Sequence, residues 1–279
     1  MKHKINITFL LLFLFLGAHI IGLRIIDNYL PKQNLQGETT IKDLPLNIER
    51  PEVQEKTSFV AIFFIIIIST LIALLLIKFN AMKLWKLWFF VSVFLTLTIG
   101  LTAFIPQTYA IILALIVASI KLFKPNVIIN NLAELFIYGG LSAIFVPILS
   151  LFSISVLLVL ISIYDFYSVY KSKHMIKLAK FQTKSKIFAG INIPYQIKEK
   201  KKIKFTSGIL GGGDLGFTLF FSGVILKEFG FNSALIVSFV TTLFLLGLFL
   251  YGKKGKFYPA MPVLTAGCFL GLLIIKFIF

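Results

Sequence analysis

Residues 58–77 read SFVAIFFIIIISTLIALLLI, a stretch without a charged side chain. About 20 apolar residues in a helix cover the roughly 30 Å hydrocarbon core of a bilayer. A helix also satisfies its own backbone hydrogen bonds, which hydrocarbon cannot do. We therefore predict a transmembrane helix here.

Eight further apolar stretches lie on either side of it. The nine predicted spans are residues 5–23, 58–77, 87–105, 108–120, 132–149, 151–170, 206–226, 233–250 and 259–279. Only Pro106 and Gln107 join the third span to the short fourth one, so these two also fit a helical hairpin. We expect an all-α, polytopic membrane protein with one membrane-embedded domain, residues 1–279. Spans one to five occupy residues 1–149, and spans six to nine occupy residues 150–279.

The composition agrees with a membrane protein. Hydrophobic residues make up 58% of the chain and charged residues 14%, and the mean hydropathy is +0.95. The 28 Lys and Arg residues outnumber the 11 Asp and Glu residues. In a soluble domain this excess would indicate a nucleic-acid partner, but basic loops that face an anionic leaflet explain it better. We predict contact with membrane lipid and no nucleic-acid partner.

The distribution of basic residues predicts the orientation. With alternating spans, one face receives 21 of the 28 Lys and Arg residues, and eleven of them lie in residues 171–205. The positive-inside rule then places the N-terminus and residues 171–205 in the cytoplasm of a cell-membrane protein, with the C-terminus outside. The start Met1-Lys2-His3-Lys4 also fits a cleavable secretory signal, although no clear small-x-small cleavage site follows it.

Three acidic residues fall inside the predicted spans, where an ionisable side chain is a functional candidate by default. Glu134 lies near the start of its span, where a carboxylate complements the helix dipole, so we give it a structural interpretation. Asp165 lies in ISIYDFY, residues 161–167, and fits an interfacial pair with Lys171 or Lys173 as well as a functional role. Asp214 lies in an apolar stretch without a cation.

Glycines surround Asp214 at positions 211–213 and 216. Each costs a helix about 1 kcal/mol relative to alanine, so something must offset them. One explanation is close packing against span six, which would bring Asp214 up to Asp165. The other is a loosened helix that admits water and an extended peptide. The two explanations are compatible.

A pair of carboxylic groups suits peptide hydrolysis. When two such groups share one proton, the ionised member accepts a proton from the attacking water. The protonated member polarises the scissile carbonyl and later helps the amine to leave. This chemistry needs no metal, cofactor or covalent nucleophile. The single cysteine, Cys268, also excludes an internal disulfide and a thiolate metal cluster.

A third motif opens the last span, at Tyr258-Pro259-Ala260-Met261-Pro262, where two prolines favour a rigid helix start. With this motif in place, the chain resembles the presenilin and signal peptide peptidase family, and most of all its archaeal-type members. The motifs match in order: Tyr164-Asp165, then Gly211-Gly212-Gly213-Asp214 for Gly-x-Gly-Asp, then Pro259-Ala260-Met261 for Pro-Ala-Leu.

The resemblance implies a presenilin-like fold and an intramembrane aspartyl protease of the Gly-x-Gly-Asp type. It implies that Asp165 and Asp214 are catalytic and that substrates are transmembrane segments of other proteins. The residues that bind substrate or shape the site would be Tyr164, Phe205, Gly211, Gly213, Pro259, Ala260, Met261 and Pro262. Met261 replaces the family leucine, a nearly isosteric change. The predicted orientation resembles that of presenilin, which favours substrates with an extracytoplasmic N-terminus.

The segment Ile203-Lys204-Phe205 alternates apolar and polar side chains just before span seven. We hypothesise that it pairs with an unfolded substrate segment by strand addition. Three alternatives stay open at this point. They are an ion-coupled membrane transporter that uses the intramembrane acids, a prepilin-type peptidase and a non-catalytic scaffold. The absence of matching acids and glycines in the first half argues against a transporter, and the two other motifs argue against a prepilin-type peptidase.

Overall fold

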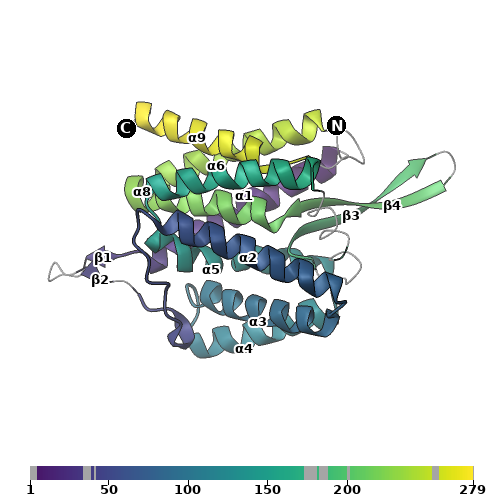
Figure 1. Ribbon diagram of the computed structural model, residues 1–279, viewed down its shortest axis with the longest axis horizontal. Helices are drawn as coiled ribbons and strands as arrows, with labels where there is room; N and C mark the ends of the chain where they lie inside the picture. The colour runs from purple at the N-terminus through teal and green to yellow at the C-terminus, as the bar shows by residue number, and fades with distance from the viewer. Residues whose placement is uncertain are drawn as a thin grey trace.

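The computed structural model describes residues 5–33, 39–40, 42–172, 181, 188–199, 202–252 and 258–278. Within this part of the chain, the helices form one bundle with roughly aligned axes (Figure 1). The α-helices are α1 (Ile5–Tyr29), α2 (Ser58–Lys78), α3 (Met82–Leu101), α4 (Gln107–Phe123), α5 (Val127–Phe145), α6 (Leu151–Tyr170), α8 (Gly212–Tyr251) and α9 (Met261–Ile278).

The nine-span fold class is confirmed once α8 is divided at its kink. Gly230 interrupts α8 with a φ of 83°, a conformation that glycine adopts without strain, so residues 212–229 and 231–251 form two separate limbs. With these limbs, the described residues hold nine membrane helices. Seven of the helices, α8 counted once, are long and apolar enough to cross a membrane, and α4 is a shorter apolar helix.

Several predicted boundaries are wrong by about a turn or more. α3 begins at Met82, not at residue 87. α5 begins at Val127, not at residue 132, because the Asn126 side chain caps it by accepting from the amides of Ile128 and Ile129. The seventh span begins at Gly212, not at residue 206, because the preceding residues form a strand.

Helix α1 occupies the centre of the bundle and packs between α5 and α8. The pair α3 and α4 covers the other side of α5, while α6 and α9 pack against α8. Small residues permit the closest approaches: a Cβ on Gly140 of α5 would lie 1.9 Å from the Thr96 carbonyl oxygen of α3. Helix α2 packs mainly against α6, and only Ser58, Ile62 and Ala73 of it are buried.

Two antiparallel strand pairs accompany the helices, and the all-α prediction did not include them. Strands β1 (Lys32–Gln33) and β2 (Thr39–Thr40) form a short pair at one end of the bundle. Strands β3 (Gly190–Glu199) and β4 (Lys202–Gly211) form a longer hairpin at the opposite end, beside the N-terminus (Figure 1). The C-terminal end of α9 lies at the β1–β2 end.

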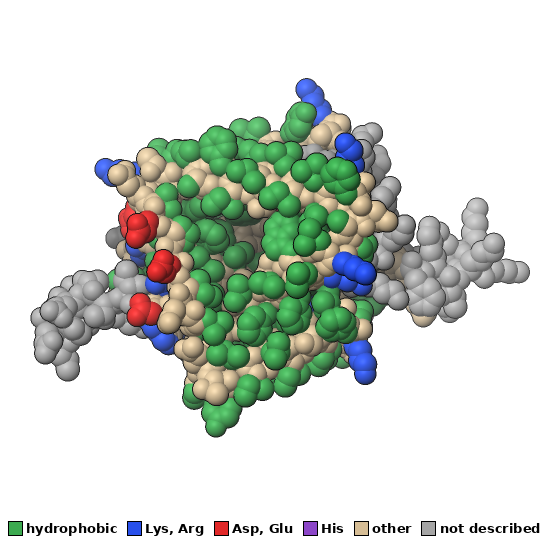
Figure 2. Space-filling view, turned by 60° about the horizontal axis from the view of Figure 1, so that its bottom comes forward, with side chains coloured by type: hydrophobic (Ala, Val, Ile, Leu, Met, Phe, Trp, Pro, Cys, Tyr) green, Lys and Arg blue, Asp and Glu red, His purple; other side chains and the backbone are tan. Residues whose placement is uncertain are grey.

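Apolar side chains cover the middle of the face shown in Figure 2. The acidic side chains visible on this face all gather at one end, and charged side chains are confined to the two ends. Many large apolar side chains are exposed, which is expected of a surface that faces lipid. A soluble protein rarely exposes such a large continuous apolar surface.

The two tryptophans report on the depth of α3 in the bilayer. Trp85 and Trp88 lie in the first two turns of α3, and tryptophan is enriched at membrane interfaces, so we expect this end of α3 to lie at an interface. We expect lipids brominated near the headgroup to quench the intrinsic fluorescence more strongly than lipids brominated near the end of the acyl chain. Stronger quenching by the deep bromines would contradict this placement of α3.

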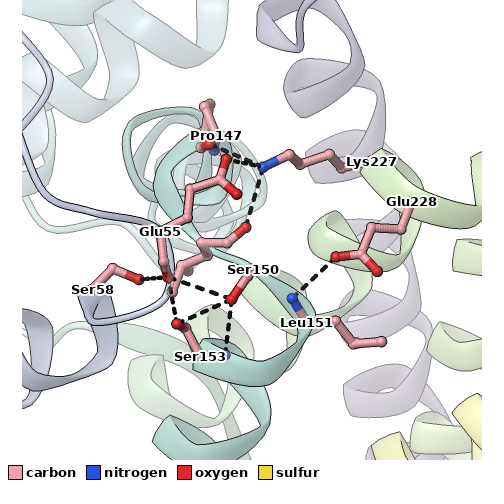
Figure 3. A network of polar contacts seen from close by, with 9 residues as sticks. Glu55, Ser58, Pro147, Ser150, Leu151, Ser153, Lys227 and Glu228 are labelled. Atoms are coloured by element: carbon pink, nitrogen blue, oxygen red, sulfur yellow. Dashed lines mark hydrogen bonds and ion pairs between the residues drawn. The ribbon is translucent and has the colours of Figure 1, made fainter.

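A polar cluster joins the segment before α2 to the C-terminal end of α5, the start of α6 and the end of the first limb of α8 (Figure 3). The carbonyl oxygen of Glu55 accepts hydrogen bonds from the hydroxyls of Ser58, Ser150 and Ser153. The carboxylate of Glu228 accepts from the first amide of α6, that of Leu151, at 3.0 Å. The N-terminal end of the weakly packed α2 is therefore anchored through the segment that precedes it.

Lys227 is the cation of this cluster. Its Nζ donates to a carboxylate oxygen of Glu55 at 2.8 Å and to the carbonyl oxygens of Pro147 and Leu149 at 3.1 and 3.3 Å. These carbonyls follow the end of α5, where helical partners are missing.

Replacement of Lys227 by Met is expected to lower the melting temperature in detergent more than replacement of Glu55 by Gln. Loss of Lys227 leaves two carbonyls without a donor, at a cost of about 1–3 kcal/mol. Glu55 is 54% exposed, so its ion pair contributes at most about 1 kcal/mol. Thermal unfolding of the two variants measures the difference, and equal shifts would assign the stabilisation to the ion pair instead.

Candidate active site

Asp165 lies on α6, in the last third of the helix and at the hairpin end of the bundle. The Ser150 side chain caps the other end of α6 by accepting from the Ser153 amide at 3.2 Å. One turn before Asp165, the Ser162 and Thr265 hydroxyls form a 2.8 Å hydrogen bond between α6 and α9. Side-chain hydrogen bonds of this kind hold helices together in membranes. Asp165 is therefore placed on a helix that is fixed to α9.

The carboxylate of Asp165 binds the start of α9. Its Oδ2 accepts from the Met261 amide at 3.2 Å, and the Ala260 amide also interacts with the carboxylate. The first amides of a helix have no partner within the helix, so they are available to a carboxylate. Asp165 therefore binds the start of α9 and does not form the predicted pair with Lys171. Lys173, the other predicted partner, lies outside the described residues.

The two prolines explain why these amides are available. Pro259 is buried just before α9, and Pro262 is the second helical residue, where a missing N–H costs nothing. The Ala260 carbonyl accepts from the amides of Val263 and Leu264, which starts the helix. Of the predicted motif residues, Met261 and Ala260 interact with Asp165, and Pro259 and Pro262 flank them in the chain.

Asp214 lies in the first turn of α8, directly after the strand–helix junction. We had expected it inside a helix that begins at Thr206, and this expectation is wrong because Thr206–Gly211 pair with β3. A carboxylate in the first turn is favoured by the helix dipole. Asp165 and Asp214 both lie at the hairpin end of their helices, and α6 packs against α8.

The three glycines before Asp214 meet different surroundings. A Cβ on Gly211 would lie 3.2 Å from Asp214 Oδ2, so Gly211 leaves room for the carboxylate to approach the junction. A Cβ on Gly213 would meet only Phe217, at an ordinary 3.7 Å. A Cβ on Gly212 would lie 2.1 Å from the Tyr138 hydroxyl oxygen, which is impossible without a shift. The close approach inferred from the glycines therefore exists, but its partner is α5 and not α6.

The remaining predicted site residues lie nearby in the chain. Tyr164 is partly buried beside Asp165 on α6. Phe205 lies in β4 opposite Gln196 of β3, and its side chain is outside the described part. Most of the basic segment 171–205 before the hairpin also lies outside the described residues.

Glu134 has a different role from the one expected. It is two turns into α5 and 1% exposed, and its carboxylate forms an ion pair with Lys121 of α4, so it does not act on the start of the helix. Lys121 Nζ also donates to Asn130 Oδ1 at 2.7 Å. The sequence contained the signal for this pair, because a lone acid and a lone base near the ends of consecutive spans can neutralise each other.

Comparison with known proteins relates this arrangement to proteases. A profile of the family described as signal-peptide peptidase, presenilin aspartyl protease matches residues 39–200, more than half of the chain. The matched region includes Asp165 and ends before Asp214. No curated protein sequence matches the chain.

Two solved structures share the fold. One is a presenilin family intramembrane aspartate protease in a C222 space group, with a TM-score of 0.66 and 19% identity over 98% of this chain and 99% of that chain. The other, in a P2 space group, has a TM-score of 0.65 and 20% identity over 96% of this chain and 97% of that one.

Proposed function

Because this chain belongs to the signal-peptide peptidase and presenilin family of aspartyl proteases, we propose that Asp165 and Asp214 are its catalytic pair. The chain is an intramembrane aspartyl protease, and the pair would make it one of the Gly-x-Gly-Asp type. The observation that carries the assignment is the contact between Asp165 and the start of α9, because it joins two of the three motifs in one polar site. Asp214 belongs to the third motif and lies at the same end of the bundle.

The chemistry requires the two carboxyl groups to share one proton across a water molecule. The ionised group takes a proton from the water as its oxygen attacks the scissile carbonyl carbon. The protonated group donates to the carbonyl oxygen, and a proton is then delivered to the leaving amine. The amides of Met261 and Ala260 keep the Asp165 carboxylate in one orientation throughout.

The substrates that suit this site are membrane-spanning segments that unfold locally before cleavage. A helix hides its peptide bonds, so the scissile segment must become extended, and an extended segment can bind a sheet edge. The β3–β4 hairpin leads directly into the helix that carries Asp214. It offers two edges, and they differ.

The outer edge of β3 is occupied at its base. Asn131 of α5 accepts from the Asn192 amide and donates to the Asn192 carbonyl oxygen, both at 3.0 Å. Two residues further out, Pro194 has no N–H to offer on the same edge. This edge is therefore unsuited to another strand.

The outer edge of β4 is the better binding surface. The backbone N–H and C=O of Asn192 point away from β4, so those of its partner Ile209 point away from β3. By alternation along the strand, the backbone groups of Phe205, Ser207 and Gly211 also point away from β3. Among the described residues, no backbone hydrogen bond joins this edge to another element. We propose that the substrate adds here as a third strand, which leads its chain toward Asp214.

We also propose that the hairpin end of the bundle faces the cytoplasm of a cell-membrane protein. Helix α1 begins and α6 ends at this end, and the basic residues of the sequence before α1 and after α6 are joined to these helix ends. Substrates would then enter with their N-terminus on the extracytoplasmic side.

The test is direct incubation of the purified protein in detergent with a labelled transmembrane peptide. Mass spectrometry is expected to find new termini inside the apolar segment, with one atom of water oxygen in each new carboxyl group. No cleavage, together with ion flux in proteoliposomes, would overturn the assignment in favour of a transporter.

The cleavage rate is expected to depend on pH through the shared proton. Below the working range both groups are protonated and no base remains, while above it both are ionised and no acid remains. The rate measured on saturating peptide should therefore fall on the alkaline side. A rate that still rises well above neutral pH would contradict a shared-proton mechanism.

A further inference from the structure

A buried polar network runs along α5 toward the start of α8. Glu134 and Tyr138 are one turn apart on α5 and share a face of the helix. The Glu134–Lys121 ion pair is almost completely buried, with exposed fractions of 1% and 3%. Desolvating such a pair inside a membrane protein is expensive, so a functional reason is the default explanation.

Tyr138 lies in a groove formed by two glycines of α8. Its hydroxyl is against Gly212, and a Cβ on Gly216, one turn later, would lie 3.5 Å from Tyr138 Cδ1. The ring therefore lies along the first turn of α8, the turn that carries Asp214. With Gly212 in contact and Gly216 one turn behind it, Tyr138 determines where this turn sits relative to α5.

The hydroxyl of Tyr138 lies against the first turn of α8, the turn that carries Asp214. It is buried, without a hydrogen-bond partner among the described residues. The carboxylates of Glu134 and Asp214 are both close enough to interact with it electrostatically. One Glu134 oxygen pairs with Lys121, and the other is buried without a hydrogen-bond partner among the described residues, so Glu134 is a second possible acceptor for the single proton of Tyr138. Because the Lys121 cation offsets the charge of Glu134, Asp214 is the acceptor that the proposal below assigns to this proton.

The same network reaches the hairpin. Lys121 Nζ donates to Asn130 Oδ1, and Asn130 Nδ2 donates to the carbonyl oxygen of Gly190 at 3.2 Å. Gly190 is paired with Gly211, the last residue of β4. The Gly212 amide also donates to the Ala189 carbonyl oxygen at 3.2 Å. One buried cation is thus linked both to the base of the hairpin and to the first turn of α8.

We propose that Tyr138 is a positioning residue for Asp214 and that the Lys121–Glu134 pair holds it in that role. The ring fixes the first turn of α8, and the hydroxyl donates to the Asp214 carboxylate during catalysis. This inference rests on the proposed function, in which Asp214 is catalytic.

The first experiment measures kcat and KM for peptide cleavage by Tyr138→Phe. We expect kcat to fall about tenfold or more with KM within about twofold, because a contact that acts on the catalytic group affects the chemical step. The acidic limb of the pH–rate profile should move to higher pH, since the hydroxyl no longer favours the ionised form of the pair. A merely structural tyrosine would leave this profile in place.

The second experiment uses the steric contact. Gly212→Ala is expected to lower kcat about 100-fold or more, while Gly247→Ala, where a Cβ meets nothing within 4 Å, serves as the matched control. The new Cβ would also lie 2.9 Å from Tyr138 Cζ, so the ring must be removed together with the hydroxyl. Gly212→Ala/Tyr138→Leu should then recover activity toward the level of Tyr138→Leu alone. Failure of this rescue, with Tyr138→Phe as active as the wild type, would overturn the positioning role.

The third experiment tests the ion pair without leaving a buried charge. Lys121→Gln/Glu134→Gln removes both charges and keeps hydrogen-bonding side chains. It is expected to lower kcat about as much as Tyr138→Phe, and the triple variant should show little further loss, because the groups act as one unit. If the loss in kcat of the triple variant equalled the product of the losses in the double variant and in Tyr138→Phe, the link between the ion pair and Tyr138 would be overturned. Asp214→Asn in the same assay distinguishes failure of the positioning role from failure of the proposed function, since an active Asp214→Asn would refute the proposed function itself.

Discussion

Asp165→Asn and Asp214→Asn are each expected to lower kcat for peptide cleavage by at least about 10³-fold, with a much smaller change in KM. Each substitution keeps the shape of the side chain and removes its ability to exchange a proton. A pair that shares one proton cannot work with one member, so both variants should be equally inactive. The measurement is the rate of appearance of the new peptide termini.

The control for this prediction is Asp43→Asn. Asp43 is exposed in the segment before α2, so the same chemical change there should leave kcat within about twofold of the wild type. Thermal unfolding of all three variants verifies that they are folded. A folded Asp165→Asn or Asp214→Asn protein that retains more than a tenth of the wild-type rate would remove that residue from the mechanism.

The sequence was sufficient for the fold class because membrane spans depend on length and apolarity alone. The sixth span, residues 151–170, coincides with α6 at both ends. The seventh was wrong at its start because Thr206–Gly211 is apolar enough to extend a span, and its strand pairing depends on residues 190–195. A short apolar run does not distinguish a buried helix from a strand.

The site was partly accessible from the sequence. Asp165, Asp214 and the Pro259–Pro262 segment were found as intramembrane charges and proline signals, and the family resemblance connected them. The contact between Asp165 and the α9 amides could not be derived, because it depends on how two helices 96 residues apart in the chain meet. Motif order says nothing about such a distance.

Tyr138 was missed for a related reason. A tyrosine in an apolar span is indistinguishable from an ordinary interface residue until its neighbour is known. The glycines at 212 and 216 showed that something large or close must lie against the start of α8, and only the packing of α5 identifies it. The spacing of the two glycines matches one helical turn, which predicts a groove but not its occupant.

Phe205→Pro is expected to lower kcat/KM by about 10- to 100-fold, because it removes one outward N–H from the edge of β4 proposed to bind substrate. The position is suited to this test. The Phe205 amide points away from β3, so proline there leaves the hydrogen bonds within the hairpin in place. Steady-state cleavage of the transmembrane peptide measures the loss.

The register supplies a matched control on the opposite edge. Gln196 is directly paired with Phe205, and its amide points outward from β3, on the edge that already carries Pro194 and is capped by Asn131. Gln196→Pro therefore introduces the same ring into the same cross-strand pair without touching the β4 edge. If both proline variants lost activity equally, general damage to the hairpin would explain the effect. If only Phe205→Pro did, and Phe205→Ala kept its activity, the lost N–H and not the lost ring would explain the effect, which is the result expected if the substrate pairs with β4.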